Sequence, residues 1–291
     1  MRNVRLGIGF LIVLTGIFVF WKFFPDAPSP QTDTRPLVVT TIFPLYDIVK
    51  QIGGDSIRAE LILPPGASEH TFEPTPKAQR DIEEAEIIFS IGHGLDNWLY
   101  TLTTDAKKIV VVDNGIILKK EEETVDPHYW LTLENGAKIA QTIAGQLITL
   151  FPDQAEQIKG RTEVYQTLLE STDKKLKEQV ALRKGKKLVV FHDAWTYFAD
   201  AYGFEIVGTF EPTPGREPTP QYLSELKKIV TANHLSTLYA EPQFSTRGIE
   251  SFIADYNLTL SVLDPVGGGE QTGSFIELIT SNVETILNNP E

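Results

Sequence analysis

Cysteine is absent from this chain of 291 residues. Its absence excludes disulfides, thiol nucleophiles, zinc fingers and iron–sulfur clusters, because all of them require thiol groups. Any metal ion must therefore be bound by imidazole and carboxylate groups. Only five histidines are present, so each can be considered individually as a ligand.

Basic residues are also scarce. Lys and Arg number 26 against 39 Asp and Glu, which gives a formal net charge of −13. This charge repels the phosphates of nucleic acid and attracts cations, so we expect no nucleic-acid partner. Hydrophobic residues make up 42% and charged residues 22%, a composition typical of folded globular proteins. The length suits two lobes better than one small core.

A long apolar run lies near the N-terminus, at residues 6–21, and follows Arg2 and Arg5. It is longer than a typical signal-peptide core and slightly short of the about 20 residues that span a bilayer. No A-x-A-like cleavage site follows, and no cysteine is available for lipid attachment. We expect residues 1–24 to be an uncleaved membrane anchor, with a cleaved secretory signal as the alternative, and both would export the rest of the chain. Residues 25–36 predict a Pro-rich linker.

From residue 37 onward, short β-branched runs alternate with helical stretches, a pattern typical of βαβ units with parallel strands. Between the two groups of strands, apolar residues of 152–184 recur at helical spacing without an intervening proline. They are Ile158, Val164, Leu168, Leu169, Leu176 and Val180. The prediction is an α/β fold of two lobes, residues 37–151 and 185–291, each with a central parallel sheet, joined by one long rigid helix at 152–184. The predicted strands are 37–43, 59–64, 86–92, 108–113, 187–192, 204–210, 236–241 and 258–264.

Four side chains that could bind a metal lie just past predicted strand ends or in nearby loops. His70 lies in the proline-rich stretch PPGASEHTFEPTP, His128 in VDPHYW, His192 at the end of LVVFH and Asp264 at the end of LSVLD. Parallel sheets bind ligands beyond the carboxyl ends of their strands, and two of these residues fall in each lobe. Three imidazoles and a carboxylate suit Zn²⁺ in tetrahedral coordination.

Other residues remain alternatives or have a more ordinary interpretation. Glu69 could replace Asp264 as the fourth ligand. His93 lies between two glycines and could substitute as a ligand, although a loop role is the simpler interpretation, and His234 is expected on the surface. Glu241 also ends a strand, where we expect it to support the site or to pair with Arg247.

Five ordered segments of the chain resemble the signature segments of the periplasmic solute-binding proteins of zinc and manganese ABC transporters. The resemblance extends from about residue 37 to the C-terminus. The segments are LPPGASEHTFEPTPKAQRDIEEAEIIFSIGHGLDNWL, DPHYWLTLENGAKIAQTIAGQL, VVFHDAWTYFADAYGF, YAEPQFSTRGIESFI and VLDPVGG.

The resemblance implies two α/β lobes bridged by a long helix, with one metal ion between them. It implies the ligands His70, His128, His192 and Asp264, the same set that the residues themselves suggest. It also implies delivery of the ion to a membrane permease and its ATPase, and we expect a monomer. Manganese-binding members typically carry a carboxylate at the third position, so His192 favours Zn²⁺ over Mn²⁺. A manganese- or iron-binding protein of the same family is the alternative.

The sequence departs from the zinc-binding members in one loop and leaves two other functions open. The stretch LKKEEETVDPH is acidic, whereas many zinc-binding members have a histidine-rich loop there. A zinc hydrolase would need an open coordination position and a general base such as Glu69, and the chain has no HExxH motif. An adhesin is the third possibility, because an anchored surface protein can also serve attachment.

Overall fold

The computed structural model describes residues 33–121, 124–183, 185–269 and 272–289. The chain divides into two units, Met1–Thr34 and Arg35–Glu291, and the second contains every helix and strand that is described. The predicted anchor at 1–24 and most of the predicted linker at 25–36 lie outside the described residues. Among the described helices, none combines the length and the apolar character that crossing a membrane requires.

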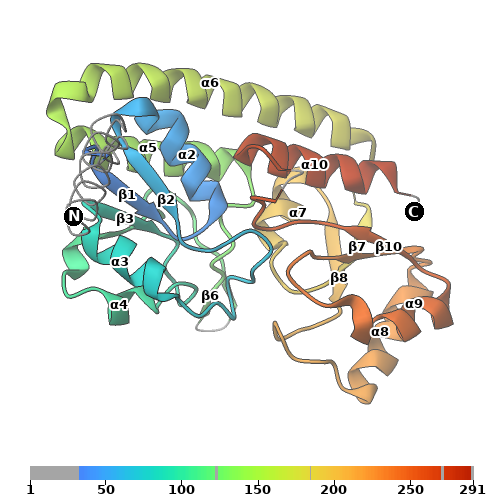
Figure 1. The fold of residues 1–291 in the computed structure, drawn as a ribbon. Helices are drawn as coiled ribbons and strands as arrows, with labels where there is room; N and C mark the ends of the chain where they lie inside the picture. Colours follow the sequence, from blue (N-terminus) through green and yellow to red (C-terminus); the bar gives the residue numbers. More distant parts are fainter. Residues whose placement is uncertain (1–32, 122–123, 184, 270–271, 290–291) are drawn as a thin grey trace, which may run out of the picture. The chain divides into compact units, whose positions relative to one another are not determined.

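Two four-stranded parallel sheets form the centre of Arg35–Glu291, which confirms the predicted α/β class. Their strand orders are β2-β1-β3-β4 and β10-β9-β7-β8, so both sheets have the same topology along the chain. We call each sheet with its surrounding helices a lobe (Figure 1). The first sheet consists of β1 Leu37–Thr40, β2 Arg58–Leu61, β3 Ile87–Ser90 and β4 Ile109–Val111, and the second of β7 Lys187–Val190, β8 Glu205–Thr209, β9 Thr237–Ala240 and β10 Thr259–Val262.

The predicted strands were too long at their carboxyl ends. β7 ends at Val190, although the prediction reached His192, and β10 ends at Val262 rather than Asp264. The hydrophobic pattern could not locate these ends because the next residues, Phe191 and Leu263, remain buried. His192 and Asp264 consequently lie two residues beyond their strands, in the loops at the sheet edges.

Helices flank both sheets, and side-chain caps fix several of their first turns. The hydroxyls of Thr75, Thr132, Thr219 and Ser274 each accept a hydrogen bond from a backbone N–H of the following helix. A two-residue antiparallel pair, β5 Lys120–Glu121 with β6 Thr124–Val125, precedes α5. The helices are α2 Phe43–Gly53, α3 Pro76–Glu84, α4 Leu99–Leu102, α5 Leu133–Leu150, α7 Thr196–Tyr202, α8 Pro220–Ala232, α9 Glu250–Tyr256 and α10 Phe275–Asn288.

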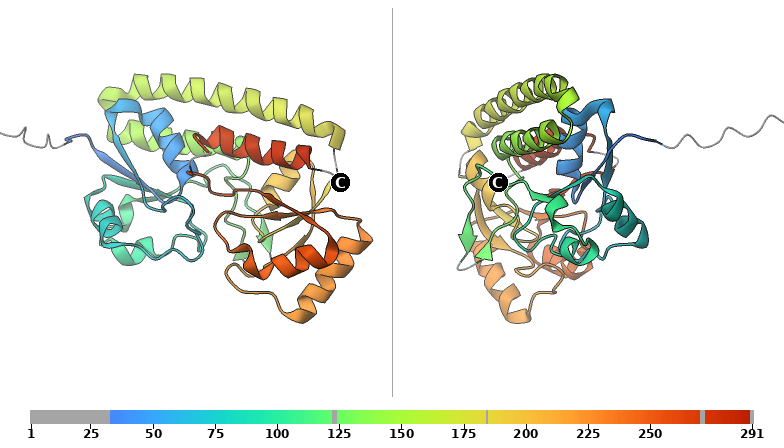
Figure 2. Two further views of the ribbon diagram at one scale, coloured as in Figure 1. Left: turned by 45° about the vertical axis from the view of Figure 1, so that its right-hand side comes forward. Right: turned by 90° about the vertical axis from the view of Figure 1, so that its left-hand side faces the viewer.

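The predicted long helix is α6, Ala155–Val180, with single 3-10 turns at Pro152–Gln154 and Ala181–Arg183. Its 26 residues extend about 39 Å. It packs against α5 and α2 of the first lobe and against α10 and α7 that follow the second sheet's strands. Figure 2 shows it running along both lobes.

The apolar pattern of α6 predicted only part of its buried face. Ile158, Leu169, Leu176 and Val180 are buried together with Thr162 and Tyr165. Two residues in the predicted pattern, Val164 and Leu168, are instead 73% and 51% exposed. The observed fold agrees with two lobes joined by a long helix, while the boundaries 37–151, 152–184 and 185–291 stay predictions.

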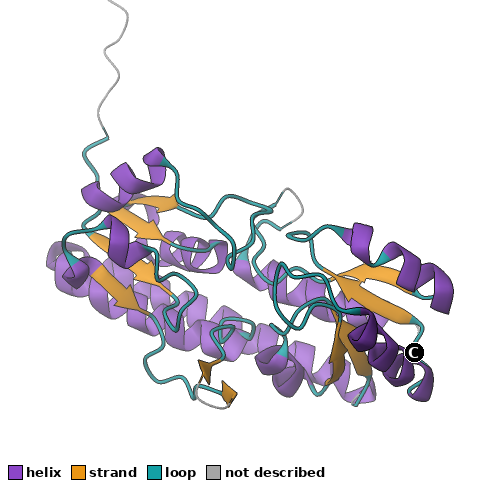
Figure 3. Ribbon diagram, turned by 90° about the horizontal axis from the view of Figure 1, so that it is seen from below, coloured by secondary structure: helices purple, strands orange, loops and turns teal. Residues whose placement is uncertain are grey.

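A continuous hydrophobic cluster connects the two lobes. It contains Val38 of β1 and Val190 of β7 together with residues of α2, α5, α6 and α10. Figure 3 shows that loops from both sheets lie in the region between them. Because the shared core fixes both sheets, the loops at their edges are held at defined positions.

Asp47 gives the fold a pH-dependent contact. It lies buried on α2, and its Oδ2 accepts a 2.8 Å hydrogen bond from the backbone N of Phe275 at the start of α10. Burial raises the pKa of this carboxyl above its ordinary value, although the hydrogen bonds from Phe275 and Gln51 oppose the rise. The folded protein therefore binds this proton more tightly than the unfolded chain, so stability is lost as pH rises through the ordinary pKa toward the folded one.

We expect Asp47→Asn to remove this loss while keeping an oxygen for the Phe275 N–H. The variant's unfolding temperature relative to the original protein should rise from pH 4 to pH 7, because only the original carboxyl loses a tightly bound proton in this range. Thermal unfolding of the metal-free proteins, followed by circular dichroism, measures it. An equal difference at both pH values would contradict the expectation.

Candidate metal centre

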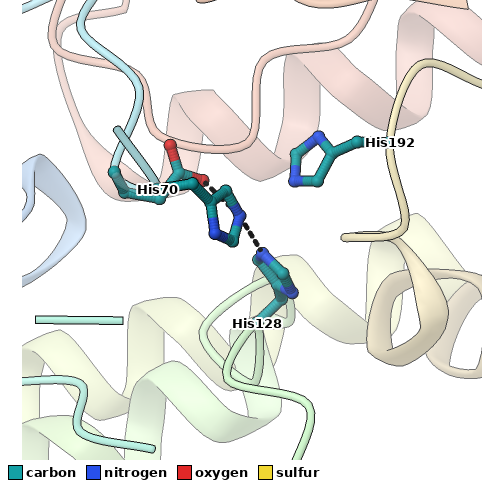
Figure 4. Close-up of side chains that lie close together, drawn as sticks. His70, His128 and His192 are labelled. Carbon is teal, nitrogen blue, oxygen red and sulfur yellow. Dashed lines mark hydrogen bonds and ion pairs between the residues drawn. The ribbon is translucent and has the colours of Figure 1, made fainter. Parts of the chain in front are cut away.

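Three histidines from three separate loops point toward one another (Figure 4). His70 lies in the proline-rich loop between β2 and α3, His128 between β6 and α5, and His192 between β7 and α7. The loop of His70 is held locally, because its backbone N donates a 3.3 Å hydrogen bond to Ser68 Oγ. Prolines and turns thus place imidazoles where neither a helix nor a strand could hold them.

The imidazoles are close enough to share one ion. Nε2 of His70 lies 3.1 Å from Nε2 of His128. The ring of His192 has its centroid 5.1 Å from that of His70 and 5.3 Å from that of His128. One ligand atom from each of the three, and one from the Glu69 carboxylate, all lie within 4.8 Å of one another. The three histidines predicted from the sequence are therefore brought together.

Carboxylates orient two of the imidazoles. Asp126 Oδ1 lies 2.8 Å from His128 Nδ1, and Glu241 Oε2 lies 2.6 Å from His192 Nδ1. A ring N–H directed at a carboxylate leaves the opposite nitrogen, Nε2, as a lone-pair donor to a metal. Glu241 also accepts a 3.0 Å hydrogen bond from Trp195 Nε1, so its expected supporting role takes this form rather than a pair with Arg247.

The supporting role of Asp126 was not predicted from the sequence. The signal was present, because Asp126 stands two residues before His128 in the same segment and can reach both its backbone and its ring. Its Oδ1 also accepts a 2.9 Å hydrogen bond from the backbone N of His128. A short Asp-Pro-His turn thus supplies both a candidate ligand, His128, and the group that orients its ring.

Buried polar atoms without partners line the centre. In the described part of the chain, Nε2 of His192 and both carboxylate oxygens of Glu69 are buried and have no hydrogen-bond partner. Leaving such groups unpaired is costly, by about 1–3 kcal/mol each and more for a charged group. A cation bound at this point would satisfy all three atoms, so the donor set fits a metal ion.

The pKa shifts follow from crowding and burial. Burial, together with repulsion from His128 and His192, lowers the pKa of His70 to about 3. Burial also lowers the pKa of His192, but the carboxylates of Glu241, Glu69 and Asp193 together outweigh this effect and the net shift is upward. Burial raises the pKa of Glu69 to about 7. His70 is therefore neutral near pH 7, whereas His192 and Glu69 keep part of their protons, which a binding metal ion would have to displace.

Asp264, the predicted fourth ligand, lies near this group but is not within it. Its Oδ1 accepts hydrogen bonds from Gln243 Nε2 at 2.8 Å, Gly267 N at 2.9 Å and Val266 N at 3.1 Å. Its charge is close enough to contribute to the raised pKa of Glu69. The alternative ligand considered from the sequence, Glu69, occupies the fourth place in the observed conformation, and the role of Asp264 stays a prediction.

The two remaining histidines lie outside the centre. His93 Nε2 contacts Asp113 Oδ2 at 2.9 Å, and its backbone φ of 53° places it in a tight turn. His234 is exposed just after α8 and also has a positive φ, 52°. Both agree with the loop and surface roles expected from the sequence.

An open cleft of about 220 Å³ leads to the three histidines. Both lobes contribute to it, the first through Asp126 and Pro127 and the second through Asp193, Pro212 and Pro214. An ion can therefore reach the imidazoles from solvent. The arrangement combines closely spaced metal-binding atoms with a path to solvent.

The sequence is similar to metal-binding proteins of known families. Residues 38–289 match the family described as zinc-uptake complex component A, periplasmic. The chain is 28% identical over 255 residues to the zinc-binding lipoprotein AdcA of Streptococcus pneumoniae, covering 81% of this chain and 51% of AdcA. It therefore spans about half the length of that relative. It is 29% identical over 281 residues to the manganese ABC transporter substrate-binding lipoprotein PsaA of Streptococcus mitis, covering 90% of each.

Solved structures share the fold. A crystal structure of ZnuA is similar with a TM-score of 0.80 at 28% identity, over 87% of this chain and 98% of that one. The periplasmic zinc-binding protein TroA from Treponema pallidum is similar in fold, with a TM-score of 0.78 at 24% identity over 87% of this chain and 98% of TroA. From the family match over most of its length, the chain belongs to the periplasmic zinc-uptake component A family.

Proposed function

We propose that the chain is the extracytoplasmic zinc-binding component of a metal-uptake ABC transporter. It captures one Zn²⁺ between its lobes and delivers it to a membrane permease driven by an ATPase. The convergence of three imidazoles and a carboxylate from both lobes, with buried and unpartnered ligand atoms, carries this proposal. Its export would be directed by residues 1–24, and we propose that it acts as a monomer.

Zinc is the proposed ion because of the ligand set. His70, His128 and His192 provide three borderline-soft nitrogens, and Glu69 or Asp264 provides one oxygen. This set suits tetrahedral Zn²⁺ better than Mn²⁺, which prefers more oxygen ligands. Relatives are named for zinc and for manganese, so the ligands rather than the names support the choice.

Capture fits the site better than hydrolysis. Four protein ligands would complete a tetrahedral shell and leave no position for a water molecule to attack a substrate. Glu69 would have to act as a general base in a hydrolase, yet it lies among the ligand atoms. We therefore propose a binding protein rather than an enzyme.

Titration of the chelator-treated protein tests the proposal. Calorimetry should give one tightly bound Zn²⁺ per chain, and a competition series should show weaker binding of Mn²⁺. Ester and peptide substrates should not be turned over by the loaded protein. Binding of no zinc, tighter binding of manganese, or zinc-dependent hydrolysis would each contradict it.

Zinc affinity should also decrease in acid. Because the pKa of His192 lies above the ordinary 6.5 and that of Glu69 is about 7, the metal must displace protons from these groups below neutral pH. Each displaced proton lowers the apparent affinity about tenfold per pH unit. His70, with a pKa of about 3, contributes only in strong acid. Competition with a chelator of known pH dependence measures the effect, and an affinity that is constant from about pH 5.5 to pH 7.5 would refute it.

A further inference from the structure

The side chain of Tyr197 bonds to two residues that frame the loop of His128. Its hydroxyl accepts a 2.7 Å hydrogen bond from the backbone N of Lys119 and donates a 3.2 Å bond to the backbone O of Asp126. Lys119 and Asp126 also bond to each other, because Asp126 N donates to Lys119 O at 3.0 Å. One phenol therefore holds both strands at the base of the β5–β6 pair.

Asp126 in turn determines how His128 faces the metal centre. Its Oδ1 bonds the backbone N of His128 at 2.9 Å and lies 2.8 Å from the ring Nδ1. A shift of Asp126 would therefore move the backbone and the ring of this histidine together. The hydroxyl of Tyr197 is thus hydrogen-bonded directly to Asp126, the residue that orients His128.

Tyr197 is also rigidly connected to His192. It is the second residue of α7, which begins four residues after His192, and Ala194 N donates a 3.0 Å bond to His192 O in the intervening turn. Its ring is buried, with 4% exposed. The phenol thus joins the segment that carries His192, from the second lobe, to the segment that carries His128, from the first.

We propose that Tyr197 is a positioning residue of the metal centre, and this inference rests on the proposed function. Its hydroxyl fixes the separation of His128 and His192 by bonding the base of the β5–β6 pair to α7. The bridge holds the two imidazoles at bonding distance from a common ion before the ion arrives. Lys119 reinforces the contact, since its ammonium pairs with Asp200 and bonds to Thr196 O at 3.4 Å on the same helix.

The proposal distinguishes the hydroxyl from the ring. Tyr197→Phe keeps the packed ring and removes only the two hydrogen bonds to the loop. Losing an outer group that orients a ligand typically lowers metal affinity about 10–100-fold. We expect a decrease of about tenfold in Zn²⁺ affinity, mainly through faster dissociation, because the bound geometry is no longer prepared in advance.

Tyr202 on the same helix provides a matched control. It is 1% exposed, and its hydroxyl bonds Asp173 Oδ1 at 3.2 Å and lies 3.5 Å from Leu133 N. Tyr202→Phe therefore removes a buried phenol hydroxyl that also reaches the first lobe, without touching Asp126. A general loss of stability would affect both variants alike.

The experiment compares the full chain with both variants by zinc titration, by the rate of zinc transfer to a chelator and by the visible spectrum of the Co²⁺-loaded proteins. Tyr197→Phe should weaken zinc about tenfold and change the Co²⁺ bands, while Tyr202→Phe leaves affinity within about twofold and the spectrum unchanged. Thermal unfolding confirms that each variant is folded, and the spectrum, recorded at saturating Co²⁺, reports ligand geometry even if stability decreases.

Two results would overturn the proposal. One is a Tyr197→Phe variant whose zinc affinity and Co²⁺ spectrum are unchanged from the unmodified protein. The other is a Tyr202→Phe variant that loses as much zinc affinity as Tyr197→Phe. Failure of the unmodified protein to bind zinc would instead overturn the proposed function, so the two failures can be told apart.

Discussion

Replacing His128 by alanine is expected to lower zinc affinity by about a hundredfold or more. Binding of structural Zn²⁺ by four ligands is worth about 10–16 kcal/mol, so one ligand accounts for about 3 kcal/mol, or about two powers of ten. His128 is 4% exposed and its ring is oriented by Asp126, so water cannot easily replace it in the same geometry. His70→Ala and His192→Ala should act similarly.

His234→Ala is the matched control, because His234 is exposed and lies outside the group of ligands. Calorimetric titration of all four variants, with circular dichroism to confirm folding, measures the effect. An alanine variant of His70, His128 or His192 that keeps the original affinity would remove that residue from the site. A loss of affinity in His234→Ala would show that histidine content, rather than position, matters.

Neutralising Glu69 is expected to have the second-largest effect, a decrease in zinc affinity of about 10–100-fold. Glu69→Gln keeps the shape and one carbonyl oxygen but removes the charge that partly neutralises Zn²⁺. Both oxygens of Glu69 are buried without hydrogen-bond partners in the described part of the chain, so an ion could bind them without breaking a hydrogen bond.

Asp264→Asn separates the two candidates for the fourth ligand. Its Oδ1 accepts three hydrogen bonds, which the amide oxygen of asparagine can retain. If Glu69 is the ligand, Asp264→Asn should change zinc affinity by no more than about threefold, through the loss of a nearby charge. A larger loss in Asp264→Asn than in Glu69→Gln would contradict the assignment of Glu69 and support the ligand first predicted from the sequence.

Much of the fold could be read from the order of apolar runs. Both sheets and the long helix follow from β-branched runs alternating with helical spacing, because burial of parallel strands and of one helix face leaves a strong pattern. The ends of the strands and the buried face of the long helix were harder to predict. Apolar residues continue past β7 into Phe191, and on α6 the buried stripe uses Thr162 and Tyr165 while Val164 faces solvent. Tertiary packing, which a linear pattern does not contain, decides these positions.

The three histidines that converge could be predicted, but the carboxylates that lie around them were less predictable. His70, His128 and His192 stand out because prolines or strand ends hold them where no element needs a histidine. Glu69 is adjacent to His70, and only the three-dimensional course of the loop decides whether it faces the cleft or solvent. The contact between Tyr197 and Asp126 joins residues 71 positions apart, and no local pattern indicates it.

Anomalous diffraction at the zinc absorption edge, from crystals of the zinc-loaded protein, tests most directly whether both lobes bind one ion. A single peak about 2.0–2.1 Å from Nε2 of His70, His128 and His192 is the predicted result. A peak bonded to residues of only one lobe, or no peak among these three nitrogens, would contradict it.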